Sequence, residues 1–445
     1  MEKTPYPKLQ KLLCAAGILV LALLFILWAG KSGGLGLLEL LAALAAIGLF
    51  LALCLRFVPE CFAFCFGASE DPRPAKSAFS PLSLFCAGLL WALVNYLLIG
   101  CVLHYVNHNL TLRQYIDFWQ SADAYHYVCI ARDWYLSEGA LDRLVQLVFL
   151  PGFPLVLRLF HYLTGEYLVA GMLCSSLCFS AALCVIYQLA LLDFDTPEAL
   201  RAVVFAALMP GAFFFFAPMS ESLFLLLCAL CVYCARRRKW VLAGMLGACA
   251  AFTRSLGLML FVPVFFEWLR AFLQGRERLR RCAALLLIPL GFAAYCVVNY
   301  TVAGNPFQFM IYQREHWSQS LGLFFNTAAY QTRYALSSAA KGDARQLVGL
   351  WLPNLIALFT APTLLFLAAR RLRPSYTAWA IAYYIVAVGA TWLLSAPRYM
   401  AVLLPLPLAL ALLSDKKAAK IVLYTLLGCG NLAYLILFAL RWNVW

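Results

Sequence analysis

Long apolar runs separated by short polar connections follow one another along almost the whole chain. A helix needs about 20 mostly apolar residues to cross the hydrocarbon core of a bilayer. The pattern therefore predicts an all-α, polytopic membrane protein. We expect about 13 membrane-spanning helices, over residues 12–28, 35–58, 82–103, 168–192, 200–217, 223–235, 240–252, 256–272, 282–302, 347–369, 378–394, 400–413 and 421–440.

The segment 147–163 is also mostly apolar, but its pattern does not favour a regular crossing. Pro151 and Pro154 lie near its start, and proline interrupts helical hydrogen bonding. Counting this segment as a span would also move the basic cluster 236–239 to the outer side of the membrane. We therefore expect a helix that lies at, or dips into, the outer leaflet.

Composition agrees with a membrane protein. Of 445 residues, 64% are hydrophobic and 12% are charged, whereas a soluble domain averages roughly 45–50% and about 25%. The mean hydropathy is +0.84, which excludes a soluble globular protein. The 34 Lys and Arg against 20 Asp and Glu leave a net charge of +14. Because the basic residues form short clusters between apolar runs, they indicate membrane topology and not a nucleic-acid partner.

Four basic clusters give a nearly consistent orientation by the positive-inside rule. Placing residues 236–239, 276–281, 370–373 and 416–420 in the cytoplasm leaves two large exterior loops, at 104–146 and 304–346. We expect any extracytoplasmic chemistry in these two loops.

Asp123 opens a short amphipathic stretch in the first exterior loop. At helical spacing Tyr127, Ile130, Ala131 and Trp134 share one apolar face, which predicts an amphipathic interfacial helix after Asp123. The aspartate has two compatible interpretations. It is either a general base at the mouth of a membrane cavity or the N-cap of this helix.

Three further charged residues lie at exterior ends of apolar runs. Glu221 follows Pro218 and either helps to cap the next helix or faces a polar cavity. Arg254 interrupts an apolar stretch whose two ends are basic; its guanidinium suits a phosphate, or it snorkels to lipid headgroups. Arg398, beside Pro397, is a second arginine of this kind.

The second exterior loop offers a polar and aromatic group at Gln313, His316 and Trp317, which either binds substrate or forms a solvated surface helix. His104 and His108 have a spacing that suits one metal ion, but no third ligand is evident, so we expect no metal site. Most of the 17 cysteines lie inside apolar runs, and no disulfide framework is implied.

Several short motifs occur in a characteristic order. They are Asp-Ala-Tyr-His-Tyr at 123–127, Phe-Leu-Pro-Gly-Phe-Pro at 149–154, Ser-Glu-Ser-Leu-Phe at 220–224, Thr-Arg-Ser at 253–255 and Pro-Arg-Tyr at 397–399. This ordered set resembles the PIG-V-like mannosyltransferases, including their prokaryotic relatives, within the GT-C glycosyltransferase superfamily.

The resemblance implies a multi-span, inverting enzyme that takes a sugar, typically mannose, from a polyprenyl-phosphate carrier on the extracytoplasmic face. Asp123 matches the catalytic acidic residue of the first exterior loop. A GT-C-like catalytic domain at 81–445 would follow an N-terminal hairpin and cytoplasmic loop at 1–80. The substrate-binding candidates are His126, Tyr127, Glu221, Arg254, Ser255, Gln313, His316, Trp317, Arg398 and Tyr399.

The carrier phosphate already activates the sugar, so we expect no nucleotide or other cofactor. The acceptor would be a lipid- or protein-linked glycan, and surrounding lipids would be the other partners. The compact loops favour a prokaryotic cell membrane, whereas eukaryotic relatives act in the endoplasmic reticulum membrane. Two alternatives remain at this stage. The first is a transporter or flippase for a lipid-linked or anionic substrate, which would also use intramembrane charges. The second is a non-catalytic membrane subunit, which would not need Asp123, Arg254 and Arg398 at one face.

Overall fold

The computed structural model describes residues 6–67, 72, 74–136 and 143–444, and most of these residues lie in helices joined by short connections. Apart from one isolated bridge between Leu321 and Ala390, the described residues contain no β-structure. The predicted all-α class is therefore confirmed. The α-helices are α1 (Pro7–Lys31), α2 (Leu37–Phe66), α3 (Pro81–Val106), α4 (Leu112–Phe118), α5 (Ala124–Asp133), α6 (Gly152–Thr164), α7 (Tyr167–Ala190), α8 (Thr196–Leu208), α9 (Glu221–Arg236), α10 (Trp240–Thr253), α11 (Phe261–Leu273), α12 (Leu287–Ala303), α13 (Gln308–Trp317), α14 (Phe324–Ala340), α15 (Ala344–Gln346), α16 (Leu352–Ala368), α17 (Pro374–Val388), α18 (Ala396–Ala401), α19 (Pro405–Leu413) and α20 (Lys417–Ala439).

Eight helical segments in the described part of the chain are long and apolar enough to cross a membrane. They are Pro7–Lys31, Leu37–Phe66, Pro81–Val106, Tyr167–Ala190, Ser255–Leu273, Leu279–Ala303, Ala344–Ala368 and Lys417–Ala439. The other five apolar runs form shorter helices, α8, α9, α10, α17 and the pair α18 and α19, so thirteen spans are not confirmed. At 1.5 Å per residue, α9 and α10 are only about 24 and 21 Å long.

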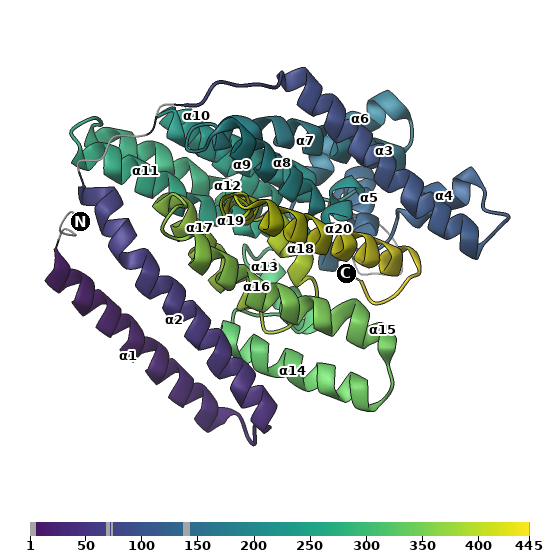
Figure 1. Ribbon diagram of the computed structural model, residues 1–445. Helices are drawn as coiled ribbons and strands as arrows, with labels where there is room; N and C mark the ends of the chain where they lie inside the picture. Colours follow the sequence, from purple (N-terminus) through teal and green to yellow (C-terminus); the bar gives the residue numbers. More distant parts are fainter. Residues whose placement is uncertain (1–5, 68–71, 73, 137–142, 445) are drawn as a thin grey trace.

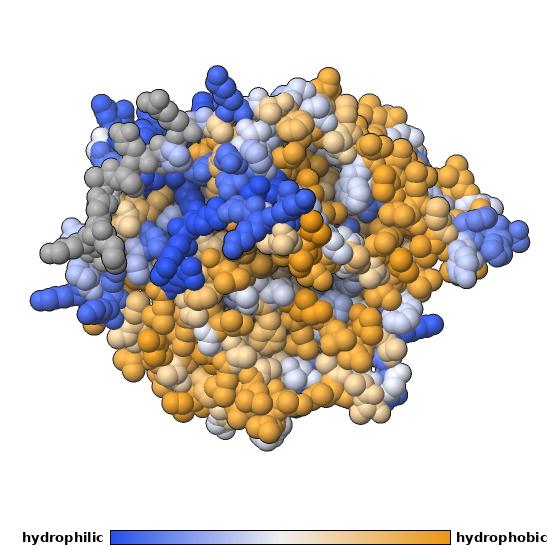
Figure 2. Space-filling view, in the orientation of Figure 1, coloured by the Kyte–Doolittle hydropathy of each residue, from blue (hydrophilic) through white to orange (hydrophobic). Residues whose placement is uncertain are grey.

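Hydrophobic side chains cover most of the visible face of the molecule, and hydrophilic ones gather mainly at the upper left (Figure 2). A soluble protein rarely exposes so large an apolar surface. Together with the eight candidate spans, this surface identifies an integral multi-pass membrane protein.

The N-terminal hairpin is joined to the expected second exterior loop. Helices α1 and α2 lie side by side (Figure 1), and the expected loop at 304–346 contains α13 and α14. Arg333 Nη2 on α14 lies 2.6 Å from Glu39 Oε2 on α2, and Trp28 Nε1 donates to Asn326 Oδ1 at 2.9 Å. Residues 304–346 are thus largely helical, and α14 packs along α2.

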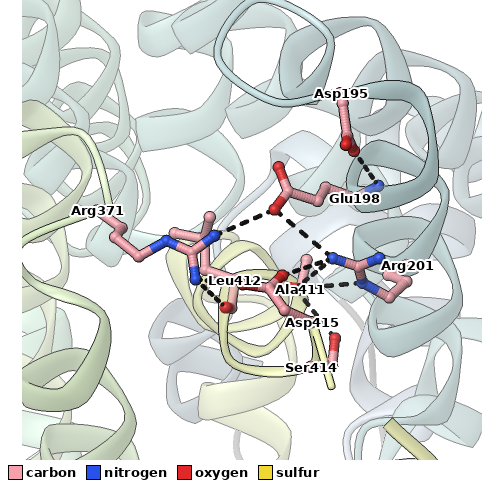
Figure 3. Close-up of polar contacts among 8 residues, drawn as sticks. All are labelled: Asp195, Glu198, Arg201, Arg371, Ala411, Leu412, Ser414 and Asp415. Atoms are coloured by element: carbon pink, nitrogen blue, oxygen red, sulfur yellow. Dashed lines mark hydrogen bonds and ion pairs between the residues drawn. The ribbon is translucent and has the colours of Figure 1, made fainter. Parts of the chain in front are cut away.

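Ion pairs tie several helices together at one end of the bundle. Asp415, between α19 and α20, accepts from Arg371 Nη1 at 2.5 Å and from Arg201 Nη2 of α8 at 2.9 Å. Arg371 also reaches Glu198 at 3.1 Å (Figure 3). The basic clusters at 370–373 and 416–420 therefore lie at the same end, as their common cytoplasmic assignment requires.

The apolar segment at 147–163 forms α6, whose 13 residues begin between Pro151 and Pro154. A helix of this length spans about 20 Å and is too short for a regular crossing. Its position at the outer leaflet stays a prediction, as does the interfacial position of α5. Residues 137–142 of the first expected loop lie outside the described residues.

Candidate active site

The backbone around Asp123 presents its carboxylate to the protein interior instead of using it as a helix cap. Ala122 has a φ of 50°, a left-handed conformation that costs a non-glycine residue about 1–2 kcal/mol. Asp123 then occupies the N-cap position of α5, yet its side chain makes no capping hydrogen bond. The carboxylate instead lies 2.5 Å from Arg398 Nη2. The N-cap interpretation of this side chain is therefore wrong.

A continuous chain of polar contacts leads from Asp123 to Tyr127, one turn later on α5. Arg398 Nε donates to Glu221 Oε1 at 2.5 Å, and the same carboxylate oxygen pairs with Arg254. Arg254 Nη1 donates to Ser220 Oγ at 3.0 Å, and Ser220 Oγ lies 2.9 Å from the hydroxyl of Tyr127. Both ends of the chain lie on α5, so it fixes this helix against α9, α10 and α18.

Glu221 is the common counter-ion of the two arginines. Its side chain is 1% exposed, and it begins α9 without any capping bond from Ser220. The carboxylate does not line a cavity, as one interpretation of the sequence expected, but lies behind Arg254 and Arg398. Two buried cations at one site would repel each other, and a buried anion between them offsets that cost.

A cavity of about 380 Å³ lies in front of these groups. It is lined by segments that are far apart in sequence, from the first exterior loop, the end of α10, α13 and the start of α18. The residues expected from the sequence that line it are Asp123, His126, Tyr127, Arg254, Ser255, Gln313, Trp317, Arg398 and Tyr399. His316 is exposed on α13 and does not line the cavity.

Hydrogen-bond donors remain available on both arginines. Arg398 Nε donates to Glu221, and its Nη2 forms an ion pair with Asp123 without a hydrogen bond; the structure records no partner for its Nη1 among the described residues. Arg254 uses only Nη1, and the structure likewise records no hydrogen-bond partner for its Nε and Nη2 among the described residues. Asp123 is 34% exposed, and among the described residues the structure records a partner only for its Oδ2. The cavity therefore combines a carboxylate oxygen that can accept a proton with guanidinium donors that suit a phosphate.

Aromatic rings form the opposite wall. His126 stacks on Phe149 with ring centroids 4.4 Å apart, and Trp317 lies edge-on to Phe149 at 6.0 Å. Burial lowers the pKa of His126, although the neighbouring carboxylate of Asp123 opposes the shift. The lowered pKa favours the neutral imidazole, and the wall offers apolar ring faces of the kind on which sugars stack.

The motif at 149–154 brings this wall into place through a close helix contact. A Cβ added to Gly152 would lie 2.8 Å from the Cα of Thr253, so only glycine lets the start of α6 approach the end of α10. On the next turns of α6, Arg158 Nε donates to the carbonyl of Ala131 at 2.6 Å. Arg158 thus holds the C-terminal end of α5, the helix that carries His126.

Sequence reasoning missed three contributors to this site. Phe149 lies in the motif at 149–154, but the sequence predicted no role for it. Gln319 lines the cavity, and no sequence motif marks it. Arg158 contacts the backbone carbonyls of α5, which the sequence does not indicate. Among the residues that the structure describes, no group of three His, Cys, Asp or Glu side chains could hold a metal ion.

Comparison with known proteins agrees with a membrane glycosyltransferase. The family model of dolichyl-phosphate-mannose-protein mannosyltransferases, which are of the GT-C type, matches residues 150–300. This range contains Glu221, Arg254 and Ser255 but neither Asp123 nor Arg398. No curated protein matches the sequence.

Similarity to solved structures is found at low sequence identity. One of these structures is the archaeal oligosaccharyltransferase AglB from Archaeoglobus fulgidus in complex with an inhibitory peptide and a dolichol-phosphate. The two share 14% identity with a TM-score of 0.39, over 80% of this chain and 56% of that one. This chain therefore spans little more than half the length of that protein. The family match supports a relation to the GT-C superfamily and does not distinguish the PIG-V-like family within it.

Proposed function

We propose that this protein is a polyprenyl-phosphate-sugar-dependent glycosyltransferase of the PIG-V-like kind. It transfers mannose to a hydroxyl of a lipid- or protein-linked acceptor on the extracytoplasmic face. The observation that supports this proposal is the convergence of Asp123, Arg254 and Arg398 on one cavity. These three residues are distant in sequence, and a base and two phosphate-binding groups are what the transfer requires.

The reaction is a single displacement at the anomeric carbon. The acceptor hydroxyl oxygen forms a bond to this carbon as the bond to the phosphate oxygen breaks, and the hydroxyl proton passes to Asp123 Oδ1. The bonding electrons leave with the polyprenyl phosphate, whose added negative charge faces the free donors of Arg254 and Arg398. Attack opposite to the leaving group inverts the configuration.

Several other lining residues have a role in this scheme. His126 and Trp317 border the space for the sugar together with Phe149, and Gln313 and Gln319, joined at 3.2 Å, lie on the acceptor side. Tyr399 and Ser255 flank Arg254, whose guanidinium lies 5.3 Å from the Tyr399 ring. His316 has no part in the scheme because it lies outside the cavity.

The test is sugar transfer by the purified protein in lipid nanodiscs. Radiolabelled polyprenyl-phosphate mannose is the donor, and octyl α-mannoside, a Ser/Thr peptide and a membrane lipid extract are the acceptors. We expect the wild-type protein to transfer mannose and Asp123→Asn to be about 10²–10⁴-fold slower, as for loss of a general base. Asp133→Asn is the matched control, since Asp133 ends the same helix and, within the described part of the chain, its ion pair is with its neighbour Arg132.

Two results would contradict the proposal. Wild-type activity in Asp123→Asn would remove the aspartate from catalysis. Absence of transfer, combined with movement of the labelled carrier across liposomes, would establish the transporter or flippase instead.

A further inference from the structure

A second hollow lies at the other end of α10 from the active-site cavity. It is a groove of about 710 Å³ between the turn that joins α9 to α10 and the 3-10 helix Leu279–Leu286. Because α10 runs from Trp240 in this groove to Thr253 in the cavity, about 21 Å of helix separates the two sites. The groove therefore takes no part in the transfer reaction.

The rim of the groove is cationic. Arg238, Lys239, Arg280 and Arg281 line it, and no acidic residue does. Arg281 Nε has Glu277 at 3.4 Å, whereas the structure records no ion pair for the other three among the described residues. Three exposed positive charges thus face one groove without a counter-ion.

One of these cations is held in a strained backbone conformation. Arg238 has a φ of 56° in the turn that closes α9, where its N–H donates to the Ala235 carbonyl at 2.9 Å. The equivalent turn at the end of α11 uses Gly275, with a φ of 69°. Glycine adopts this conformation without cost, so Arg238 carries backbone strain that glycine at this position would not.

The floor and wall of the groove are apolar. Val241 and Leu242 are exposed beside Leu287, directly below the cationic rim. Trp240 is 3% exposed, and its indole Nε1–H makes no hydrogen bond within the described structure. Gly244 permits this arrangement, since a Cβ there would clash with the carbonyl oxygen of Ala284.

We propose that this groove binds an anionic phospholipid of the leaflet opposite the active-site cavity. The phosphate headgroup lies among Arg238, Lys239 and Arg280, and an acyl chain follows the wall of Val241 and Leu242. A headgroup with a net negative charge fits because the rim has no acid, and a lipid fits because the exposed wall below the rim is apolar.

The test compares two triple variants that lose the same charge. The rim variant, Arg238→Gln/Lys239→Gln/Arg280→Gln, removes three positive charges from the groove. The control variant, Arg237→Gln/Arg276→Gln/Arg278→Gln, removes three from neighbouring exposed residues that do not line it. Native mass spectrometry then measures the affinity for the first bound phosphatidylglycerol, with phosphatidylcholine as the zwitterionic comparison. We expect about a 100-fold loss in the rim variant, from about fivefold for each of the three basic residues, and less than threefold in the control.

Equal losses in the two triple variants, equal affinity for the two lipids, or displacement of the lipid by inorganic phosphate at the same concentration would each overturn the proposal.

Discussion

Replacing Glu221 by glutamine removes the negative charge that Arg254 and Arg398 share, while the side chain keeps its size. Both arginines then lack their common counter-ion in a site where Glu221 itself is 1% exposed and Arg398 is 5% exposed. Loss of one partner from a buried ion pair costs about 3–5 kcal/mol, because the remaining charge stays buried. That is a large part of a typical folding free energy of about 5–15 kcal/mol.

Asp415→Asn is the matched control. This aspartate also accepts from two arginines, Arg201 and Arg371 (Figure 3), but its side chain is 45% exposed. Exposed ion pairs contribute about 0–1 kcal/mol. The two variants thus make the same chemical change and differ mainly in burial.

The free energy of unfolding is measured by titrating the protein from mild detergent micelles into dodecyl sulfate. We expect Glu221→Gln to lose at least 2 kcal/mol more than Asp415→Asn, a difference estimated from burial. The double variant Glu221→Gln/Arg254→Gln should lose less than the sum of its single variants, because it removes both a charge and its partner. Equal losses for Glu221→Gln and Asp415→Asn would refute the shared counter-ion.

Three further predictions concern the cavity. Arg398→Lys keeps the charge, but an ammonium lacks the planar fork that reaches Asp123 and Glu221 together; we expect kcat/KM to fall by about 10²-fold, and wild-type kinetics would contradict this role. Arg158→Gln should lose about 1.5–3 kcal/mol, because it removes a charge-assisted bond to the Ala131 carbonyl, and it should lower kcat through displacement of α5; thermal unfolding and transfer kinetics measure both effects. His126 has a lowered pKa in the folded protein. As the pH falls below about 6.5, the unfolded chain therefore binds the proton more readily than the folded protein does, and the folded protein loses stability that it has at higher pH. His126→Phe, which preserves the ring contact with Phe149, should therefore show a smaller drop in melting temperature between pH 7 and pH 5, and an identical drop would contradict the assignment.

The composition of the site was more predictable than its internal connections. Arg254 and Arg398 are charges at the ends of apolar runs, and burying a charge in lipid is costly, so hydropathy alone marks them. Asp123 was indicated instead by the amphipathic stretch that it opens in the first exterior loop. The placement of all three at one cavity agrees with that expectation. Which charge contacts which depends on how helices far apart in sequence pack, and for this reason the role of Glu221 between the two arginines could not be predicted.

Hydropathy also could not separate helices that face lipid from helices packed inside the bundle. The apolar 18-residue stretch of α1 contains no buried residue, whereas 56% of the corresponding stretch of α7 is buried. Both stretches are strongly apolar. Helix α14 was missed for the opposite reason. It contains polar residues such as Gln331 and Arg333, so hydropathy assigned its residues to an exterior loop. Its spacing of Phe324, Ala328 and Gln331, all buried, is the helical signal that could have identified it.

The short length of α10 has a consequence for the surrounding bilayer. Its 14 residues span about 21 Å, whereas the hydrocarbon core of a bilayer is about 30 Å thick. A polar cavity at one end and a cationic groove at the other therefore cannot both lie at the surface of an undistorted membrane. We expect the bilayer to thin around this helix, so that a lipid-linked phosphate meets Arg254 below the headgroup level of the neighbouring lipids.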